Sequence, residues 1–288
     1  MRFARRALRP LVGAVLLLAF GAGCRHEPPA RRFPITGQLL AVSADGGELT
    51  IRHNEVKGFM PAMVMPFKVK DRALTKGRLP GDLVKATLVV TDEEAWLEAV
   101  EKTGWAPFPE VAAVRDAATS PLLTEGEAVP DATLIDQDGR SFRLSSLRGA
   151  PLLITFIYTR CPLPDFCPRM DRHFQVLQKA IKDGRVAAGS RLLSISFDPD
   201  YDTPAVLKEH AALFGADPHV WTFATAPRAE VERFGARLGL DVLRETDSQA
   251  ISHNLRTAVI DAAGRLVTIF DGNDWTPDQA IAKLKQVS

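Results

Sequence analysis

The sequence predicts two folded domains, a small all-β, OB-like barrel followed by an α/β domain. Strand patterns separated by turn residues fill residues 33–104, the pattern fades over 105–125, and strand and helix patterns alternate over 126–288. Short strands without helices are typical of a sandwich or barrel, and alternating strands and helices are typical of a sheet covered on both faces. We therefore treat 105–125 as a linker between two domains.

The first 24 residues resemble a signal for export. Four arginines precede an apolar run at 11–20, and three small residues lead to Cys24. This order is typical of a secretory signal, and the run is too short to span a bilayer comfortably. The end of this segment, just before Cys24, resembles the cleavage site of a bacterial lipoprotein signal, although Gly21 stands where Leu is usual. We expect residues 1–24 to be a lipoprotein-type signal and Cys24 to be lipidated on the periplasmic side of a bacterial membrane, or the protein to be soluble in the periplasm if Cys24 carries no lipid.

Composition excludes one class of function. The chain has 46% hydrophobic and 25% charged residues and a formal net charge of +1. These values are ordinary for a globular protein and give no basic surface of the kind that binds a phosphate backbone. We expect no nucleic-acid partner.

The small domain is predicted from strands and the turns between them. Its expected strands are 37–43, 48–52, 83–91 and 95–100. Asp45-Gly46 separates the first two strands and favours a hairpin turn. Strand patterns of this length, with no helical pattern between them, predict the all-β class.

The large domain is predicted from alternating elements. Its expected strands are 152–158, 191–197, 220–225, 257–261 and 266–270. Its expected helices are 168–182, 204–214, 228–238 and a last helix from 277. Helices between buried strands favour crossover connections and a sheet with helices on both faces.

Two cysteines follow the first buried strand. A helix is predicted to begin at Pro168, because proline suits the first helical turn, so Cys167 is expected near the N-cap. The helix dipole would lower the pKa of a thiol there. A strand, two cysteines and a helix are typical of a thioredoxin-like fold. A structural disulfide between Cys161 and Cys167 is an alternative in an exported protein, although so short a loop constrains the unfolded chain only modestly.

Residues 126–288 resemble the Sco/SenC family of copper chaperones. The matching residues are Phe156, Thr159, Cys161, Pro162, Cys167, Phe197-Asp198-Pro199, Asp202-Thr203-Pro204, His253 and Asp261. The resemblance implies a thioredoxin-like fold and copper ligands at Cys161, Cys167 and His253. Two thiolates and one imidazole are soft ligands that suit Cu(I) or Zn. This chain has five residues between the cysteines, where the family usually has three.

A second candidate site lies in the small domain. Met60, Met63 and Met65 follow His53 closely in the sequence, and thioethers bind Cu(I) or Ag(I) and little else. This region resembles the CusF-like periplasmic copper-binding domains, which places His53, Met63 and Met65 as ligands. Met60 stands where that domain has a tryptophan over the metal, so we expect its thioether as a further ligand. Methionines also fill small cores, but the prolines and polar residues between these three argue against packing alone.

These features predict an exported copper metallochaperone rather than an enzyme. The small domain would capture Cu(I), and the large domain would hold Cu(I) or Cu(II) for a client copper protein. The family resemblance implies that this client is a cytochrome oxidase subunit, which carries the dinuclear copper centre.

Two alternatives remain. One is a thiol–disulfide reductase in which Cys161 and Cys167 form a redox pair. Thioredoxin-type reductases have two residues between their cysteines and a proline facing them, whereas this chain has five residues and His253-Asn254. The other alternative is a copper sensor or efflux accessory, for which binding is the whole function.

Overall fold

The computed structural model describes residues 29–108, 121–244 and 251–287. The predicted signal at 1–24, with Cys24, and most of the predicted linker lie outside these residues. Within the described part of the chain, no helix is long and apolar enough to cross a bilayer.

The small domain is a five-stranded antiparallel sheet. Its elements are β1 (Arg31–Val42), β2 (Glu48–His53), β3 (Met63–Lys68), the 3-10 helix η1 (Arg72–Thr75), β4 (Asp82–Val90) and β5 (Ala95–Trp105). The strand order is β3-β2-β1-β4-β5. The two edge strands approach each other where Val69, just after β3, forms a bridge to Leu97 in β5. The predicted all-β class is confirmed, and an isolated bridge joins the edges.

Strand β3 was not predicted. It contains Pro66, which has no backbone N–H to donate. A central strand bonds to a neighbour on each side and cannot spare that donor. The structure places β3 at the edge of the sheet, paired only with β2 in the strand order. Proline is tolerated on an edge strand, so the methionine segment is extended despite its prolines.

The large domain is built on a seven-stranded sheet of order β14-β13-β8-β9-β10-β6-β7. Its strands are β6 (Thr133–Asp136), β7 (Ser141–Arg143), β8 (Leu152–Ile157), β9 (Arg191–Ser196), β10 (Trp221–Thr225), β13 (Arg256–Ile260) and β14 (Leu266–Asp271). Strands β8, β9 and β10 are parallel, as the predicted crossovers require. Strands β11 (Val242–Arg244) and β12 (Ile251–His253) form a separate pair.

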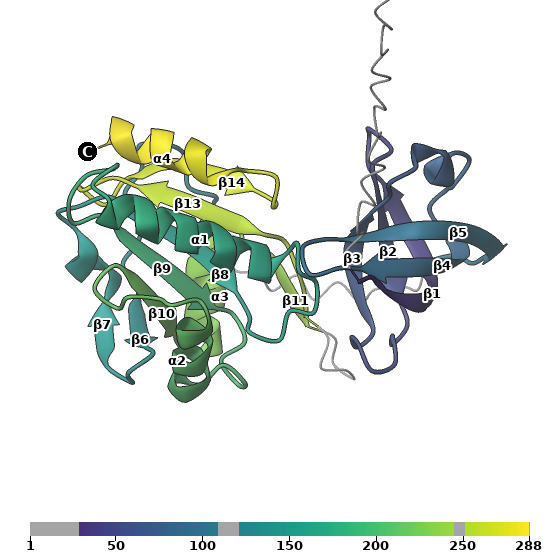
Figure 1. The fold of residues 1–288 in the computed structure, drawn as a ribbon, viewed down its shortest axis with the longest axis horizontal. Coiled ribbons are helices and arrows are strands. Elements are labelled where there is room, and N and C mark those ends of the chain that lie inside the picture. The colour runs from purple at the N-terminus through teal and green to yellow at the C-terminus, as the bar shows by residue number, and fades with distance from the viewer. Residues whose placement is uncertain (1–28, 109–120, 245–250, 288) are drawn as a thin grey trace, which may run out of the picture.

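Helices cover both faces of this sheet (Figure 1). They are α1 (Cys167–Lys182), α2 (Pro204–Leu213), α3 (Arg228–Arg237) and α4 (Pro277–Gln286), with the 3-10 helix η2 (Leu144–Leu147). On one face Phe174 of α1 packs on Trp221 of β10. Phe156 of β8 points to the opposite face, where it meets Phe234 of α3. The predicted α/β layer is confirmed, and the cysteines lie at the carboxyl end of its parallel strands.

Candidate metal centre

The two predicted thiol ligands meet at the junction of β8 and α1. Cys167 is the first residue of α1 and is almost fully buried, whereas Cys161 is partly exposed in the loop before it. The two side chains are hydrogen-bonded as free thiols, without a disulfide. The loop between them therefore brings the sulfur of Cys167 next to the sulfur of Cys161, and both thiols could bind one metal ion or react with each other.

The acidities of the two thiols reverse the expectation from sequence. Burial raises the pKa of the Cys167 thiol well above its ordinary value, and the neighbouring sulfur of Cys161 raises it further. Burial also disfavours the thiolate of Cys161, but hydrogen bonds from the side chain and backbone of Cys167 outweigh it and lower the pKa of Cys161. The prediction that the helix start would make Cys167 the thiolate is wrong, because desolvation exceeds the dipole effect. Cys161 is the more acidic of the pair.

A buried carboxylate fixes the start of the inter-cysteine loop. Asp202 is fully buried and accepts hydrogen bonds from the backbone amide of Thr159 at 3.1 Å and from its hydroxyl at 2.5 Å. It also accepts a hydrogen bond from the hydroxyl of Ser196, at the end of β9. These contacts tie the residue two before Cys161 to the neighbouring strand.

The predicted imidazole ligand, His253, ends β12. Its Nδ1 hydrogen-bonds to the carbonyl oxygen of Asn254 at 2.8 Å. As the donor in that bond, Nδ1 carries the proton, and Nε2 has the lone pair that a metal needs. Burial lowers the pKa of His253 to about 4, against a smaller rise from the Asn254 contact. The ring is therefore neutral, and available as a ligand, throughout the physiological range.

Tyr158 connects the histidine to the thiols. Its ring meets the ring of His253 edge-on, with centroids 5.5 Å apart, and the ring of Phe197 lies 4.6 Å from that of His253. Burial raises the pKa of Tyr158, and the neighbouring thiols of Cys161 and Cys167 raise it further. Tyr158 ends the strand predicted at 152–158, and its contact with His253 depends on tertiary packing that the sequence does not reveal.

The three predicted ligands gather around Tyr158 without forming a finished metal site. Over the described residues, no three side chains of His, Cys, Asp or Glu stand close enough to hold an ion. The donor set fits a soft metal, since it offers one acidic thiol, a second thiol in contact with it and a neutral imidazole.

The histidine and methionines of the small domain share one face of its sheet. His53 of β2 pairs directly with Met63 of β3, and Ile51 pairs with Met65. Side chains of directly paired residues lie on the same face, so Met65 is one position further along that face. Nδ1 of His53 bonds to the carbonyl oxygen of Asn54 at 2.7 Å, so this histidine is held as His253 is.

Glycine at position 37 allows the backbone to approach His53 closely. Gly37 of β1 pairs with His53, and a Cβ atom on it would lie 2.7 Å from the Cα of His53 and 2.3 Å from the Arg52 carbonyl oxygen. Such contacts are too short for any larger residue. Gly37 therefore sets the position of the histidine in the sheet.

All three methionines are buried. Met60, Met63 and Met65 belong to the hydrophobic cluster of the small domain, with exposures of 3%, 4% and 9%. The argument from neighbouring prolines against a packing role is therefore wrong, because β3 alternates and turns both Met63 and Met65 inward. Their role as ligands stays a prediction. Met170 packs in the core of the large domain.

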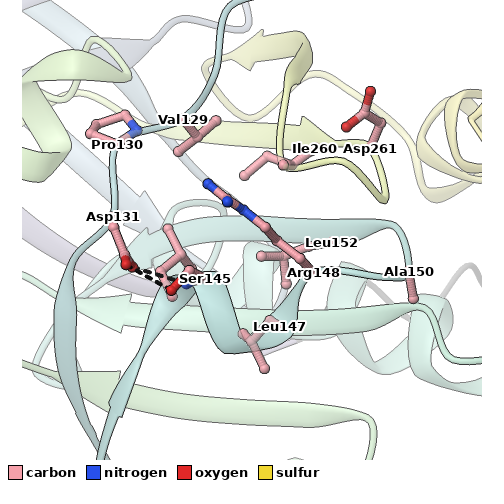
Figure 2. A pocket seen from close by; sticks show the side chains of 12 residues that line it. Val129, Pro130, Asp131, Ser145, Leu147, Arg148, Ala150, Leu152, Ile260 and Asp261 are labelled. Atoms are coloured by element: carbon pink, nitrogen blue, oxygen red, sulfur yellow. Dashed lines mark hydrogen bonds between the residues drawn. The ribbon is translucent and has the colours of Figure 1, made fainter.

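The hollow shown in Figure 2 is lined by residues of two stretches of the large domain, 129–152 and 260–264. Val129, Asp131, Ser145 and Arg148 line it, and none of the predicted ligands does. Asp131 accepts hydrogen bonds from the backbone and hydroxyl of Ser145 at 2.9 and 2.7 Å. These bonds make it a structural carboxylate, and the hollow is separate from the candidate metal centre.

Comparisons with known proteins cover both domains. Residues 124–288 match the SCO1/SenC family model, and residues 32–102 match the model of the copper binding periplasmic protein CusF. The SCO1 protein homolog of Bacillus subtilis is 30% identical over 159 residues, which cover 54% of this chain and 80% of the relative.

Solved structures resemble the large domain. A SCO1/SenC family lipoprotein from Bacillus anthracis has 24% identity and a TM-score of 0.51, and the match covers 58% of this chain and 99% of that one. This likeness shows the fold, which is thioredoxin-like. Bradyrhizobium japonicum ScoI with copper bound has 28% identity and a TM-score of 0.47, covering 56% of this chain and all of that one.

Proposed function

We propose that this chain, which belongs to the SCO1/SenC family, is an exported copper metallochaperone. The observation that carries the proposal is the hydrogen-bonded pair of free thiols at the start of α1, with the ring of His253 against the same tyrosine that the thiols contact. Copper is the cargo of this site. Cys161, Cys167 and His253 would hold it.

Each ligand has a defined proton state before copper binds. Cys161 is the readier thiolate, and His253 is already neutral. Cys167 keeps its proton in the copper-free protein. Copper binding therefore releases protons from the thiols, the last of them from Cys167, because a metal binds the thiolate form.

The small domain would supply a second, more selective site. His53 and Met63 are cross-strand partners, and Met65 and Met60 are buried in the same cluster. Thioethers have no proton to lose and prefer Cu(I) to Zn or Cu(II). We propose that this domain captures Cu(I) and that the large domain receives it.

We also propose a place and a client for the delivery. Residues 1–24 would direct export, and a lipid on Cys24 would hold the protein at the periplasmic side of a bacterial membrane. The client would be a copper protein, namely a cytochrome oxidase subunit during its assembly. The match of residues 32–102 to a periplasmic copper-binding protein supports the compartment.

A copper titration of the reduced protein tests the large-domain site. We expect Cys161→Ser, Cys167→Ser and His253→Ala each to weaken copper binding severely, and His219→Ala, a change at an exposed histidine, to leave it unchanged. X-ray absorption would show sulfur and imidazole ligands. Copper binding of ordinary strength in His253→Ala would remove the histidine from the site.

A thiol–disulfide reductase is the second candidate, and the unequal acidities of the two thiols favour it. The Cys161 thiolate would attack one sulfur of a client disulfide, breaking that S–S bond and leaving a mixed disulfide and one client thiolate. Cys167, once deprotonated, would then displace the second client thiol. The client gains two electrons and Cys161–Cys167 becomes a disulfide. Disulfide reduction and copper retention measured on the same preparation separate the two functions.

A further inference from the structure

A leucine of the inter-cysteine loop is buried in the small domain. Leu163, two residues after Cys161, is 1% exposed and belongs to the same hydrophobic cluster as Met60, Met63 and Met65. The large domain's own core does not include it. Phe166, at the end of the same loop, packs against both clusters. The loop that carries the thiols therefore leaves its own domain and enters the apolar interior of the other.

The edge of the methionine strand is covered by the strand that carries His253. The backbone amide of Val64 donates a hydrogen bond to the hydroxyl of Ser252 at 2.9 Å. Val64 lies between Met63 and Met65, and Ser252 precedes His253. An open edge strand otherwise exposes unpaired amides. β12 contacts this one, and Figure 1 shows its partner β11 on the side of the large domain that faces the small domain.

Charge at the border of this contact is complementary. Lys68, the last residue of β3, forms an ion pair with Asp274 of the large domain at 3.3 Å. Asp165 of the inter-cysteine loop is 1% exposed. The ion pair is solvent-exposed and contributes little by itself. Burial of the leucine is the larger contribution, because a fully buried leucine removes much apolar area from water.

From these contacts we infer that the inter-cysteine loop is a docking arm, whose partner is the methionine-lined end of this chain's own small domain. Leu163 fills that end, and Ser252 fixes the strand beside it. Both candidate copper sites thus border a single interface, one through Cys161 and His253 and the other through Met63 and Met65. The consequence for copper rests on the proposed function: cargo passes across a formed interface rather than between two domains on a free tether.

Docking makes a prediction that needs no metal. In the docked protein, the amides of β3 (residues 63–65, 67 and 68, since Pro66 has none) lie beside the arm and β12, and that of Val64 donates a hydrogen bond to Ser252. We expect Leu163→Asp to raise their hydrogen-exchange rates by at least about tenfold, because a charge cannot stay in the apolar cluster. Ser252→Ala, which removes only the acceptor for the Val64 amide, should raise exchange at that amide by about fivefold.

The matched control is Leu213→Asp. Leu213 ends α2 and is 81% exposed, so the same substitution there should leave exchange over 63–68 unchanged. Exchange in β9 should stay slow in all three variants, which shows that the large domain remains folded. Unchanged exchange over 63–68 in both Leu163→Asp and Ser252→Ala would overturn the docking arm.

A second readout separates docking from the proposed function. Ag(I) is added to the full protein, and the loss of free thiols at Cys161 and Cys167 is followed over time. We expect a slower loss in Leu163→Asp than in Leu213→Asp, with the same amount of Ag(I) bound at the end. An equal rate in the two variants would overturn transfer across the interface. Absence of Ag(I) binding in the wild-type protein would instead overturn the proposed function, and the exchange result would still decide whether the arm docks.

Discussion

Asp202 holds Thr159 twice, through the backbone amide at 3.1 Å and through the hydroxyl at 2.5 Å. The acceptor of both bonds is shielded from water, since Asp202 is fully buried. Buried hydrogen bonds to a charged group are stronger than neutral ones. Because Cys161 is two residues from Thr159, this carboxylate sets where the first thiol stands.

We predict that Asp202→Ala weakens copper binding although it removes no ligand. Loss of the carboxylate leaves the amide and hydroxyl of Thr159 and the hydroxyl of Ser196 without their acceptor, which costs about 1–3 kcal/mol for each buried group left unpaired. The loop should loosen, and copper affinity should fall by about 10–100-fold, as for other residues that orient ligands. A copper titration and urea unfolding check both effects. Wild-type affinity in a destabilised variant would show that Asp202 serves folding alone.

The two thiols should react in a fixed order with an alkylating reagent. Cys161 has the lowered pKa and is partly exposed, whereas Cys167 has the raised pKa and is buried. Because the thiolate is the nucleophile, iodoacetamide at neutral pH should modify Cys161 first. Cys167→Ala should slow that reaction, because it removes the side-chain hydrogen bond that lowers the pKa of Cys161. Mass spectrometry of the labelled peptides gives the order, and earlier labelling of Cys167 would contradict it.

The parts of the fold that local patterns control were predictable. Strands β8 and β9 are short runs rich in leucine and isoleucine, and Pro204 and Pro277 begin α2 and α4 as the sequence indicates. Strand β3 was missed because Pro66 opposes a strand unless the strand lies at an edge. The edge position depends on the whole sheet, which a local pattern does not reveal.

The sequence predicted which residues make up the candidate site, but not how deeply they are buried or what surrounds them. The sequence indicates which side chains can bind copper, since that depends on their chemistry. It does not reveal burial, which raises the pKa of Cys167 against the helix dipole and turns Met63 and Met65 inward. Nor does it show that Tyr158 stands beside the histidine, or that Leu163 leaves its own domain, because both depend on tertiary packing.

Tyr158 should matter for copper through its ring rather than its hydroxyl. The ring contacts His253 edge-on, at 5.5 Å between centroids. We predict that Tyr158→Phe keeps most of the copper affinity and that Tyr158→Ala lowers it by about 10–100-fold, since the histidine loses a neighbour that orients it. Titration of both variants decides this, with thermal unfolding as a check on the cavity in the alanine variant. Equal loss in both would assign the effect to the hydroxyl.

One acidic residue remote from the copper ligands should control stability at low pH. Burial opposes ionisation of Asp131, but hydrogen bonds from Ser145 and Arg143 outweigh it and lower its pKa from 3.8 to about 2. A carboxylate whose pKa is lower in the folded than in the unfolded protein stabilises the fold at pH values above its unfolded pKa. That stabilisation is lost as pH falls from about 4 through about 2. The full contribution of Asp131 to the free energy of unfolding is about 2 kcal/mol. Asp131→Asn should flatten the fall in urea stability over this range, and the exposed Asp92→Asn should not.

The methionine cluster can be tested without disturbing its packing. Met63 and Met65 are buried beside His53, so leucine at both positions keeps their volume and apolar character. Such exchanges usually cost less than about 1.5 kcal/mol, and the domain should stay folded. If the thioethers are ligands, the Met63→Leu/Met65→Leu protein should lose Cu(I) and Ag(I) binding in the small domain, because leucine has no donor atom. Metal titration in a Cys161→Ser/Cys167→Ser background isolates that site.

Met170→Leu provides the matched control in the same background. Met170 is as deeply buried as the two cluster methionines, but it packs in the core of the large domain, where its sulfur accepts a weak contact from the hydroxyl of Thr257 at 3.9 Å. Leucine there should leave Ag(I) binding unchanged at a similar cost in stability. Full Ag(I) affinity in the Met63→Leu/Met65→Leu protein would mean that these methionines only fill the interior of the small domain, and capture of copper by that domain would have to be abandoned.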